Sequence, residues 1–352
     1  MGEESSIMGD VEVVGFVREL ASRFKGLVVY IEHRYYGTSM PFGSKSEAYK
    51  NASTLGFFTS EQALADYAQI IIDVKKNLSA ENCPVIAVGA SYGGSKILST
   101  STTCYNTIRE SWSEIDRVGA QPQGLSSLSQ TFNTCMPVNT TQDLKYNLEG
   151  IYDVLAQYDD PTGNYLQTFC NATDGGGEKT YILDKIMAGI RGIYGPECID
   201  LYDMGFNNRS GWDWQSCTEM VMPMGQGEND TMFQEDPFNL SEYTKECQQV
   251  FGVTPRPYWA PTEFGGHGIK TVLENFASNI IFSNGLRDPY SSGGVLQNIS
   301  DTVVAIYTQE GHHCKDMLTP KATDPDWLVE QRNTEINIIE EWLSKYTIAN
   351  DN

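Results

Sequence analysis

The sequence predicts an α/β fold that a long helical insertion interrupts, and three observations lead to this prediction. Short apolar runs typical of buried strands occur early in the chain, at residues 27–31 and 85–88. Similar runs return late in the chain, at residues 280–282 and 303–306. Between them, residues 101–252 contain no convincing strand and have the pattern of amphipathic helices joined by polar loops.

Helices are expected beside these strands. One is predicted over residues 13–24, and another begins at Thr59, where Thr59 and Gln62 have the spacing of a capping box. The apolar positions of this second helix recur at helical spacing and are Leu64, Tyr67, Ile71 and Val74. A C-terminal helix carries an apolar face made of Ile336, Ile339, Leu343 and Tyr346. We therefore divide the chain into residues 1–100, the insertion 101–252, and residues 253–352.

Composition restricts the function. The chain has 352 residues, 40% of them hydrophobic, so it can bury a substantial core. No apolar run reaches membrane-spanning length, so no membrane contact is expected. The formal net charge of −22 disfavours nucleic acid as a partner, because a phosphate backbone would be repelled.

Cysteines and glycosylation sequons indicate the secretory pathway. The chain has eight cysteines, and no two of them form a CxxC pair. Asn-X-Ser/Thr sequons begin at Asn51, Asn77, Asn139, Asn171, Asn208, Asn229, Asn239 and Asn298. An even cysteine number beside this many sequons is typical of a disulfide-bonded glycoprotein. Met1–Ser6 has neither the basic nor the apolar region of a signal peptide, so this chain is expected to lack the leader that such a protein needs.

A serine nucleophile is the strongest chemical signal. The apolar run 85–88 leads into Gly89-Ala90-Ser91-Tyr92-Gly93, which has the G-x-S-x-G pattern of a nucleophile elbow. In this elbow a strand turns sharply into a helix, and the glycines allow the two to approach closely. The pattern predicts that Ser91 is exposed at the turn as a nucleophile.

Such a serine needs a general base and an orienting carboxylate. Asp288 comes shortly after the predicted strand 280–282, and His312 and His313 come shortly after the strand 303–306. The chain order serine, acid, histidine is the one that accompanies the G-x-S-x-G elbow. The spacing alone leaves the choice between the two histidines open.

The chain also resembles a known family. The segments that carry the resemblance are residues 32–37 (EHRYYG), 41–43 (PFG), 59–66 (TSEQALAD), 89–94, 212–219 (WDWQSCTE), 279–288 and 310–311. Together they resemble the lysosomal Pro-X carboxypeptidase and dipeptidyl peptidase 2 family of serine peptidases, and plant-type members most closely. An esterase or lipase would share Ser91, Asp288 and a histidine, but it would explain neither residues 32–37 nor 212–219.

The resemblance implies an α/β-hydrolase fold whose inserted, mainly helical domain forms a cap over the substrate cleft. It implies an exopeptidase that cleaves proline-containing peptides in a vacuole or lysosome, or after secretion. No metal or organic cofactor is implied, and a homodimer is left open. Whether the enzyme would remove C-terminal residues or N-terminal dipeptides is open as well.

Site residues follow from the resemblance position by position. Ser91 becomes the nucleophile and Asp288 the orienting acid. Aligning Glu310–Asp316 with the family segment without a gap places the catalytic histidine at His313. The family's oxyanion hole falls on the backbone N–H groups of Tyr92 and Glu3.

Two positions of the pocket that would hold proline depart from the family. Ser95 replaces the usual methionine, and Tyr290 replaces the usual tryptophan. The smaller Ser95 side chain is expected to loosen this pocket.

The resemblance also implies a disulfide pattern. The expected pairs are Cys104–Cys170, Cys135–Cys198 and Cys217–Cys247, all inside the insertion. Cys83 and Cys314 remain, and they are expected as free thiols.

The chain departs from the family most strongly after Gly94, where the family's long apolar helix and following strand have no counterpart. We expect the first strands of the family to be missing as well. Losing central strands removes several ladder hydrogen bonds at about 1 kcal/mol each, against a total stability of about 5–15 kcal/mol. We therefore expect an incomplete hydrolase sheet. The alternative to an active enzyme is an inactive, truncated glycoprotein of the same family.

Overall fold

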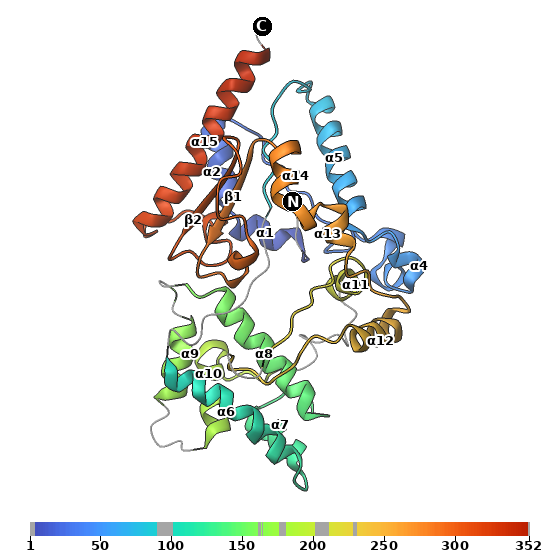
Figure 1. Cartoon of the computed structure of the whole chain (residues 1–352), viewed down its shortest axis with the longest axis vertical. Coiled ribbons are helices and arrows are strands. Elements are labelled where there is room, and N and C mark those ends of the chain that lie inside the picture. Colours follow the sequence, from blue (N-terminus) through green and yellow to red (C-terminus); the bar gives the residue numbers. More distant parts are fainter. Residues whose placement is uncertain are drawn as a thin grey trace.

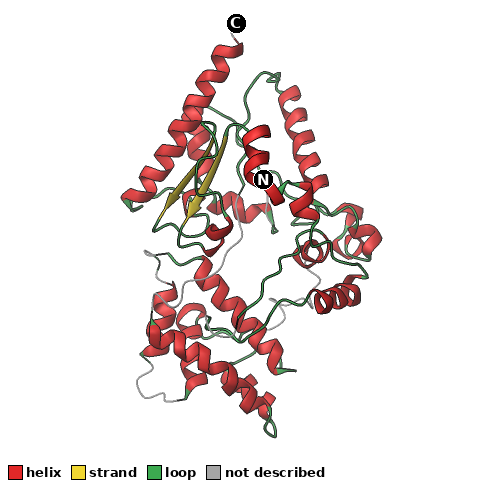
Figure 2. Cartoon of the chain, in the orientation of Figure 1, coloured by secondary structure: helices red, strands yellow, loops and turns green. Residues whose placement is uncertain are grey.

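The computed structural model describes residues 4–89, 101–160, 163, 165–175, 181–200, 211–227 and 231–350. Helices dominate this part of the chain, and its one sheet has two parallel strands. The sheet lies at one end of the molecule beside α2, α14 and α15, and helices α6–α10 gather at the other end (Figure 1). Colouring by secondary structure shows the same separation (Figure 2).

Each of the three parts into which the sequence was divided contains helices, and the third also contains the two strands. The first part contains α1 (Ile7–Val13), α2 (Phe16–Phe24), α3 (Lys45–Ala48), α4 (Ala52–Leu55) and α5 (Ser60–Asn77). The insertion contains α6 (Thr102–Gly119), α7 (Gly124–Thr131), α8 (Thr141–Gln157), α9 (Tyr165–Asp174), α10 (Ile182–Tyr194), α11 (Gly211–Thr218) and α12 (Leu240–Phe251). The last part contains α13 (Trp259–Glu263), α14 (Ile269–Phe276), β1 (Ile280–Gly285), β2 (Val303–Thr308) and α15 (Asp326–Asn350).

The late strands are confirmed. β1 and β2 pair in parallel, with Ile280 opposite Val303 and Gly285 opposite Thr308. Beside them a small core forms where Phe16 and Leu20 of α2 meet Ile336 of α15, which confirms the apolar face predicted for the C-terminal helix. Ile339 and the partly buried Leu343 extend this core, whereas Tyr346 is 39% exposed and donates its hydroxyl to the carbonyl of Asn82. Because the strands are parallel, their carboxyl ends lie at the same edge of the sheet.

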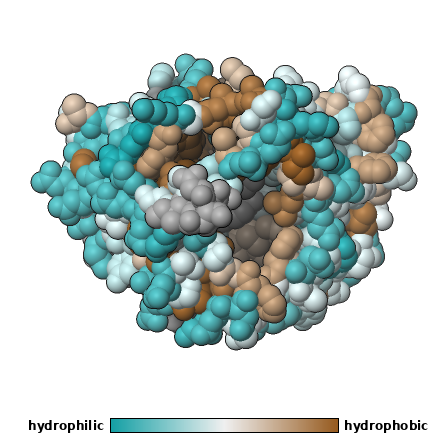
Figure 3. Space-filling model, turned by 90° about the horizontal axis from the view of Figure 1, so that it is seen from above, coloured by the Kyte–Doolittle hydropathy of each residue, from teal (hydrophilic) through white to brown (hydrophobic). Residues whose placement is uncertain are grey.

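The prediction of two early strands, at residues 27–31 and 85–88, is wrong. Residues 27–31 and 85–88 have irregular backbone, and Leu27 is 67% and Val85 50% exposed. An apolar run becomes a strand only when a neighbouring strand pairs with its N–H and C=O groups. Among the described residues, ladder pairing is confined to β1 and β2. The two segments line one cavity of about 680 Å3 together with α2 and residues 312–314. From above, hydrophobic residues gather around a hollow in the molecule (Figure 3).

The predicted helix over residues 13–24 is divided in two. Val13 ends α1, and Phe16 begins α2. A Cβ atom at Gly15 would lie 2.2 Å from the Thr319 hydroxyl oxygen, so the break at Gly15 lets residue 319 approach. There the N–H of Thr319 donates to the carbonyl of Val13 at 2.9 Å.

The helix predicted from Thr59 is α5. The Thr59 hydroxyl accepts a hydrogen bond from the N–H of Gln62, as the first half of the capping box requires. The Gln62 side chain is engaged elsewhere, since its carbonyl oxygen accepts from Arg34. Tyr67 is buried, but Leu64 is 47% exposed, so the buried face of α5 begins at Ala63 rather than at Leu64.

Helices α6–α10 share a core of their own. They bury Trp112, Tyr152 and Phe169, and the rings of Trp112 and Phe169 each meet Tyr152 edge to face. Disulfides Cys104–Cys170 and Cys135–Cys198 close long loops across these helices. Each such bridge typically adds about 2–4 kcal/mol, mainly by restricting the unfolded chain.

Two of the sequence motifs meet in a second core. Tyr36 donates its hydroxyl to the Gln215 side chain at 2.7 Å, and the Trp214 indole donates to the carbonyl of Phe58 at 3.1 Å. The third disulfide, Cys217–Cys247, joins α11 to α12 beside them. Residues 32–37 and 212–219 therefore contact each other although about half the chain separates them. The three disulfides are the pairs that the family resemblance implies, and Cys83 and Cys314 form none among the described residues.

The described sequon asparagines lie at the surface. They are Asn51, Asn77, Asn139, Asn171, Asn239 and Asn298. The remaining two, Asn208 and Asn229, lie outside the described residues. None of the helices in the described part of the chain has the length and apolar character required to span a membrane.

Candidate active site

Asp288 lies three residues beyond the end of β1. Its side chain caps the short 3-10 helix Pro289–Gly293, where Oδ1 accepts a hydrogen bond from the N–H of Tyr290 at 3.0 Å. A capping aspartate has one oxygen held by the backbone, so the other oxygen points in a defined direction. The strand end and the cap together orient this carboxylate.

His313 lies five residues beyond the end of β2, and its loop packs closely on the end of β1. A Cβ atom at Gly285 would lie 2.3 Å from the carbonyl of Gly311, so only glycine fits there. The N–H of Arg287 donates to the carbonyl of Gly311 at 2.9 Å. This close approach brings the loops that carry Asp288 and His313 together.

The two side chains form a hydrogen-bonded pair. Nδ1 of His313 lies 2.6 Å from Oδ2 of Asp288, and the histidine side chain is only 4% exposed. A carboxylate can only accept, so Nδ1 carries the hydrogen and Nε2 is left as the basic nitrogen. A histidine held in this tautomer by a carboxylate can act as the general base for a serine hydroxyl.

His312 points elsewhere. Its Nδ1 lies 3.0 Å from the carbonyl of His313, and its Nε2 lies 3.5 Å from a carboxylate oxygen of Asp160. Burial lowers the pKa of His312, and Asp160 opposes that shift. Of the two histidines that the spacing leaves open, His313 is the one that meets Asp288.

Several predicted site residues lie outside the described residues. They are Ser91, Tyr92, Ser95 and Glu3. Tyr290 is described, and it follows Asp288 on the same turn. Burial raises the pKa of Tyr290, and the charges of Asp153 and Asp288 add to the effect.

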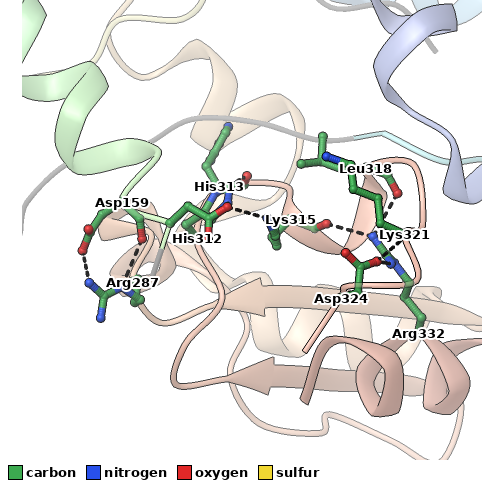
Figure 4. A network of polar contacts seen from close by, with 10 residues as sticks. Asp159, Arg287, His312, His313, Lys315, Leu318, Lys321, Asp324 and Arg332 are labelled. Atoms are coloured by element: carbon green, nitrogen blue, oxygen red, sulfur yellow. Dashed lines mark hydrogen bonds and ion pairs between the residues drawn. The ribbon is translucent and has the colours of Figure 1, made fainter. Parts of the chain in front are cut away.

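Sequence reasoning missed the residues that hold these loops from the other side. Residues 157–160, at the end of α8 and directly after it, contact both loops, and Figure 4 shows Asp159 beside Arg287. The side chain of Asp159 pairs with Arg287, and that of Asp160 pairs with Lys315. The only sequence signal is a basic residue next to Asp288 and another two positions after His313, and that is too common to be informative.

A carboxylate on α8 has an unusual pKa. Burial raises the pKa of Glu149 to about 7, repulsion from Asp153 and Asp236 adds to this shift, and Lys145 opposes it. In the unfolded chain the same carboxyl would titrate near 4.5. The folded protein therefore holds a proton on Glu149 between about pH 4.5 and 7 that the unfolded chain has lost.

Replacing Glu149 by glutamine should flatten the pH dependence of stability. Because the native state binds the extra proton, the free energy of unfolding of the unaltered protein falls as pH rises through this window. Allowing for the partial exposure of Glu149, its contribution to this decline is about 1–2 kcal/mol. Urea denaturation of Glu149→Gln between pH 4.5 and 7.5 measures it, with Glu110→Gln on the exposed face of α6 as the matched control. A decline of the same size in Glu149→Gln and in the unaltered protein would rule out Glu149 as its source.

Comparison with known proteins identifies the family of the chain. The family model described as serine carboxypeptidase S28 matches residues 1–99 and 95–335. Lysosomal Pro-X carboxypeptidases of Pongo abelii and Homo sapiens are each 32% identical over 411 aligned positions, which cover 98% of this chain and 80% of those proteins. The thymus-specific serine protease of Homo sapiens is 22% identical, over 97% of this chain and 79% of its own length. The family match covers most of the sequence, and the chain therefore belongs to the serine carboxypeptidase S28 family of serine peptidases.

Proposed function

We propose that this chain is a serine exopeptidase that cleaves peptides next to proline, with Ser91, His313 and Asp288 as its catalytic triad. The observation that carries the proposal is the 2.6 Å hydrogen bond between His313 and Asp288 at the carboxyl ends of two parallel strands. The names of the relatives support proline as the specificity determinant. In this proposal, residues Ser95 and Tyr290 contribute to the proline pocket.

The reaction follows from these roles. Nε2 of His313 takes the proton of the Ser91 hydroxyl as the oxygen attacks the carbonyl carbon of the scissile bond. Asp288 stabilises the imidazolium that forms, and the N–H groups of Tyr92 and Glu3 stabilise the oxyanion. His313 then gives its proton to the leaving amine, which departs as the acyl-enzyme forms. Water repeats the sequence and releases the second product and the free serine.

We further propose that residues 1–100 and 253–352 form an α/β-hydrolase core, that residues 101–252 form its cap, and that the core sheet is incomplete. The family match supports this, because it falls in two pieces that meet at residues 95–99. The alignment with the Pro-X carboxypeptidases also spans 411 positions although this chain has 352 residues. The relatives therefore carry internal stretches that have no counterpart here.

The incomplete sheet favours a second candidate, an inactive glycoprotein that retains the triad residues. The exposure of Leu27 and Val85 is the specific observation behind it, because both belong to segments that a complete sheet would bury. The three disulfides and the exposed sequon asparagines support a secreted, vacuolar or lysosomal location for either candidate.

One experiment separates the two candidates. The protein is purified from a secretory host and treated with a fluorophosphonate probe, with Ser91→Ala as the control. Turnover is then measured on matched peptides that differ only in having proline or alanine beside the scissile bond. An exopeptidase should show probe labelling that depends on Ser91 and hydrolysis of the proline peptide. A folded protein that shows neither result is the inactive glycoprotein, and hydrolysis without a proline preference would contradict the proposed specificity.

A further inference from the structure

The end of helix α8 contacts the candidate active site at four consecutive residues. The carbonyl of Gln157 accepts a hydrogen bond from the N–H of His313 at 3.2 Å. The ring of Tyr158 meets the ring of His313 edge to face, with centroids 5.6 Å apart. Asp159 and Asp160 pair with Arg287 and Lys315. We call residues 157–160 the α8 terminus.

The strongest of these contacts joins Asp159 to Arg287. The Arg287 Nε donates to the carbonyl of Asp159 at 3.1 Å, and its Nη2 donates to the Asp159 carboxylate. The Asp159 side chain is 6% exposed and that of Arg287 is 29% exposed, so the pair is largely shielded from solvent. Two hydrogen bonds from one guanidinium to one residue fix both its position and its orientation.

The positive charges of Arg287 and Lys315 suit the C-terminal end of α8. The last carbonyls of α8 carry the partial negative charge of a helix C-terminus, which favours nearby cations. Arg287 and Lys315 supply these cations from the two loops, and Figure 4 shows Arg287 meeting Asp159. Arg287 directly precedes Asp288, and Lys315 comes two residues after His313. Each loop is therefore held within two residues of its proposed catalytic side chain.

We propose that Asp159, through Arg287, is a positioning residue for the Asp288–His313 pair, so that the insertion holds the catalytic geometry as well as covering the cleft. The inference rests on the proposed function. Asp288 is oriented by its own turn, and His313 by the loop after β2. The contact between Gly285 and Gly311 brings the turn and the loop together, and the α8 terminus contacts both of them at once from another side. Moving either side chain by about 1 Å can lower the rate of such a reaction about 100-fold.

The test compares Asp159→Asn with Asp116→Asn. Both variants remove the charge from an ion pair of the insertion, but Asp116 pairs with Lys145 within the helices and is not in contact with the active-site loops. Asp159→Asn should lower kcat about 10- to 100-fold with a smaller change in KM, whereas Asp116→Asn should leave kcat within about twofold. The double variant Asp159→Asn with Arg287→Gln should lose no more than the larger of the two single losses, because the two residues act through each other.

A second readout does not depend on activity. The proton that His313 Nδ1 shares with Asp288 should give a proton NMR signal far downfield, and Asp288→Asn identifies it by removing it. In Asp159→Asn this signal should shift or broaden, and in Asp116→Asn it should stay in place. If the unaltered protein proves inactive, the proposed function fails while this signal still tests the positioning role. If Asp159→Asn lowers the melting temperature as Asp116→Asn does and changes neither kcat nor the signal, Asp159 is only a structural ion pair.

Discussion

Replacing His313 by alanine is expected to lower kcat/KM on a proline peptide by about 10,000-fold or more. The variant removes the proposed general base, and it leaves Asp288 without the imidazole that it orients. Because the side chain is only 4% exposed, stability must be measured beside activity, and circular dichroism with urea denaturation serves for this. Labelling by a fluorophosphonate should fall along with turnover, since both need an activated serine.

Two other histidines provide the comparison for this variant. His312→Gln should retain most of the activity, because His312 faces Asp160 rather than Asp288. His267→Gln changes an exposed histidine on the 3-10 helix Gly266–Gly268 and should match the unaltered protein. A loss of turnover in His312→Gln, with turnover retained in His313→Ala, would reverse the assignment of the base.

Replacing Arg332 by methionine should destabilise the fold by about 3–5 kcal/mol. Arg332 extends from α15 into the loop after His313 and is 5% exposed. Its guanidinium donates to Asp324 at 2.6 Å and to the carbonyl of Asp316 at 2.7 Å, and it also reaches the carbonyls of Lys315 and Leu318. Methionine keeps much of the side-chain volume but leaves a buried carboxylate and three carbonyls without this donor. Removing one partner of a buried ion pair is strongly destabilising, because the other partner stays buried and uncompensated.

Urea denaturation measures this cost, and Arg23→Met is the matched control. Arg23 pairs with Glu340 of the same helix α15, but both side chains are about half exposed. Breaking such a surface pair should cost less than about 1 kcal/mol. Equal losses in the two variants would show that burial does not strengthen the Arg332 network. Activity should also fall in Arg332→Met, because the loop from residue 315 to 324 is continuous with His313.

Local sequence patterns predicted helices α5 and α15 correctly, because a helix forms its backbone hydrogen bonds within one segment. Helix α5 begins at Ser60, directly after its predicted capping residue Thr59, and α15 buries Ile336 and Ile339 on the predicted face. The same reasoning failed for residues 27–31 and 85–88. A helix makes its hydrogen bonds within one segment, whereas a strand needs a neighbour that may lie anywhere in the chain. The break at Gly15 escaped prediction for a similar reason, because it accommodates Thr319 from the far end of the sequence.

The sequence by itself determined the family, the candidates Ser91 and Asp288, and, through the resemblance, the disulfide pairs and the choice of His313. These conclusions rest on the types of residues and their order along the chain, and both can be read without knowing the fold. The tertiary structure shows His313 rather than His312 against Asp288, as the alignment with the family implies, and it alone brought the end of α8 onto both loops. Neighbouring residues have the same sequence context, but their side chains leave the backbone in different directions. Which of them meets a distant carboxylate is decided by the path of the loop and the packing around it.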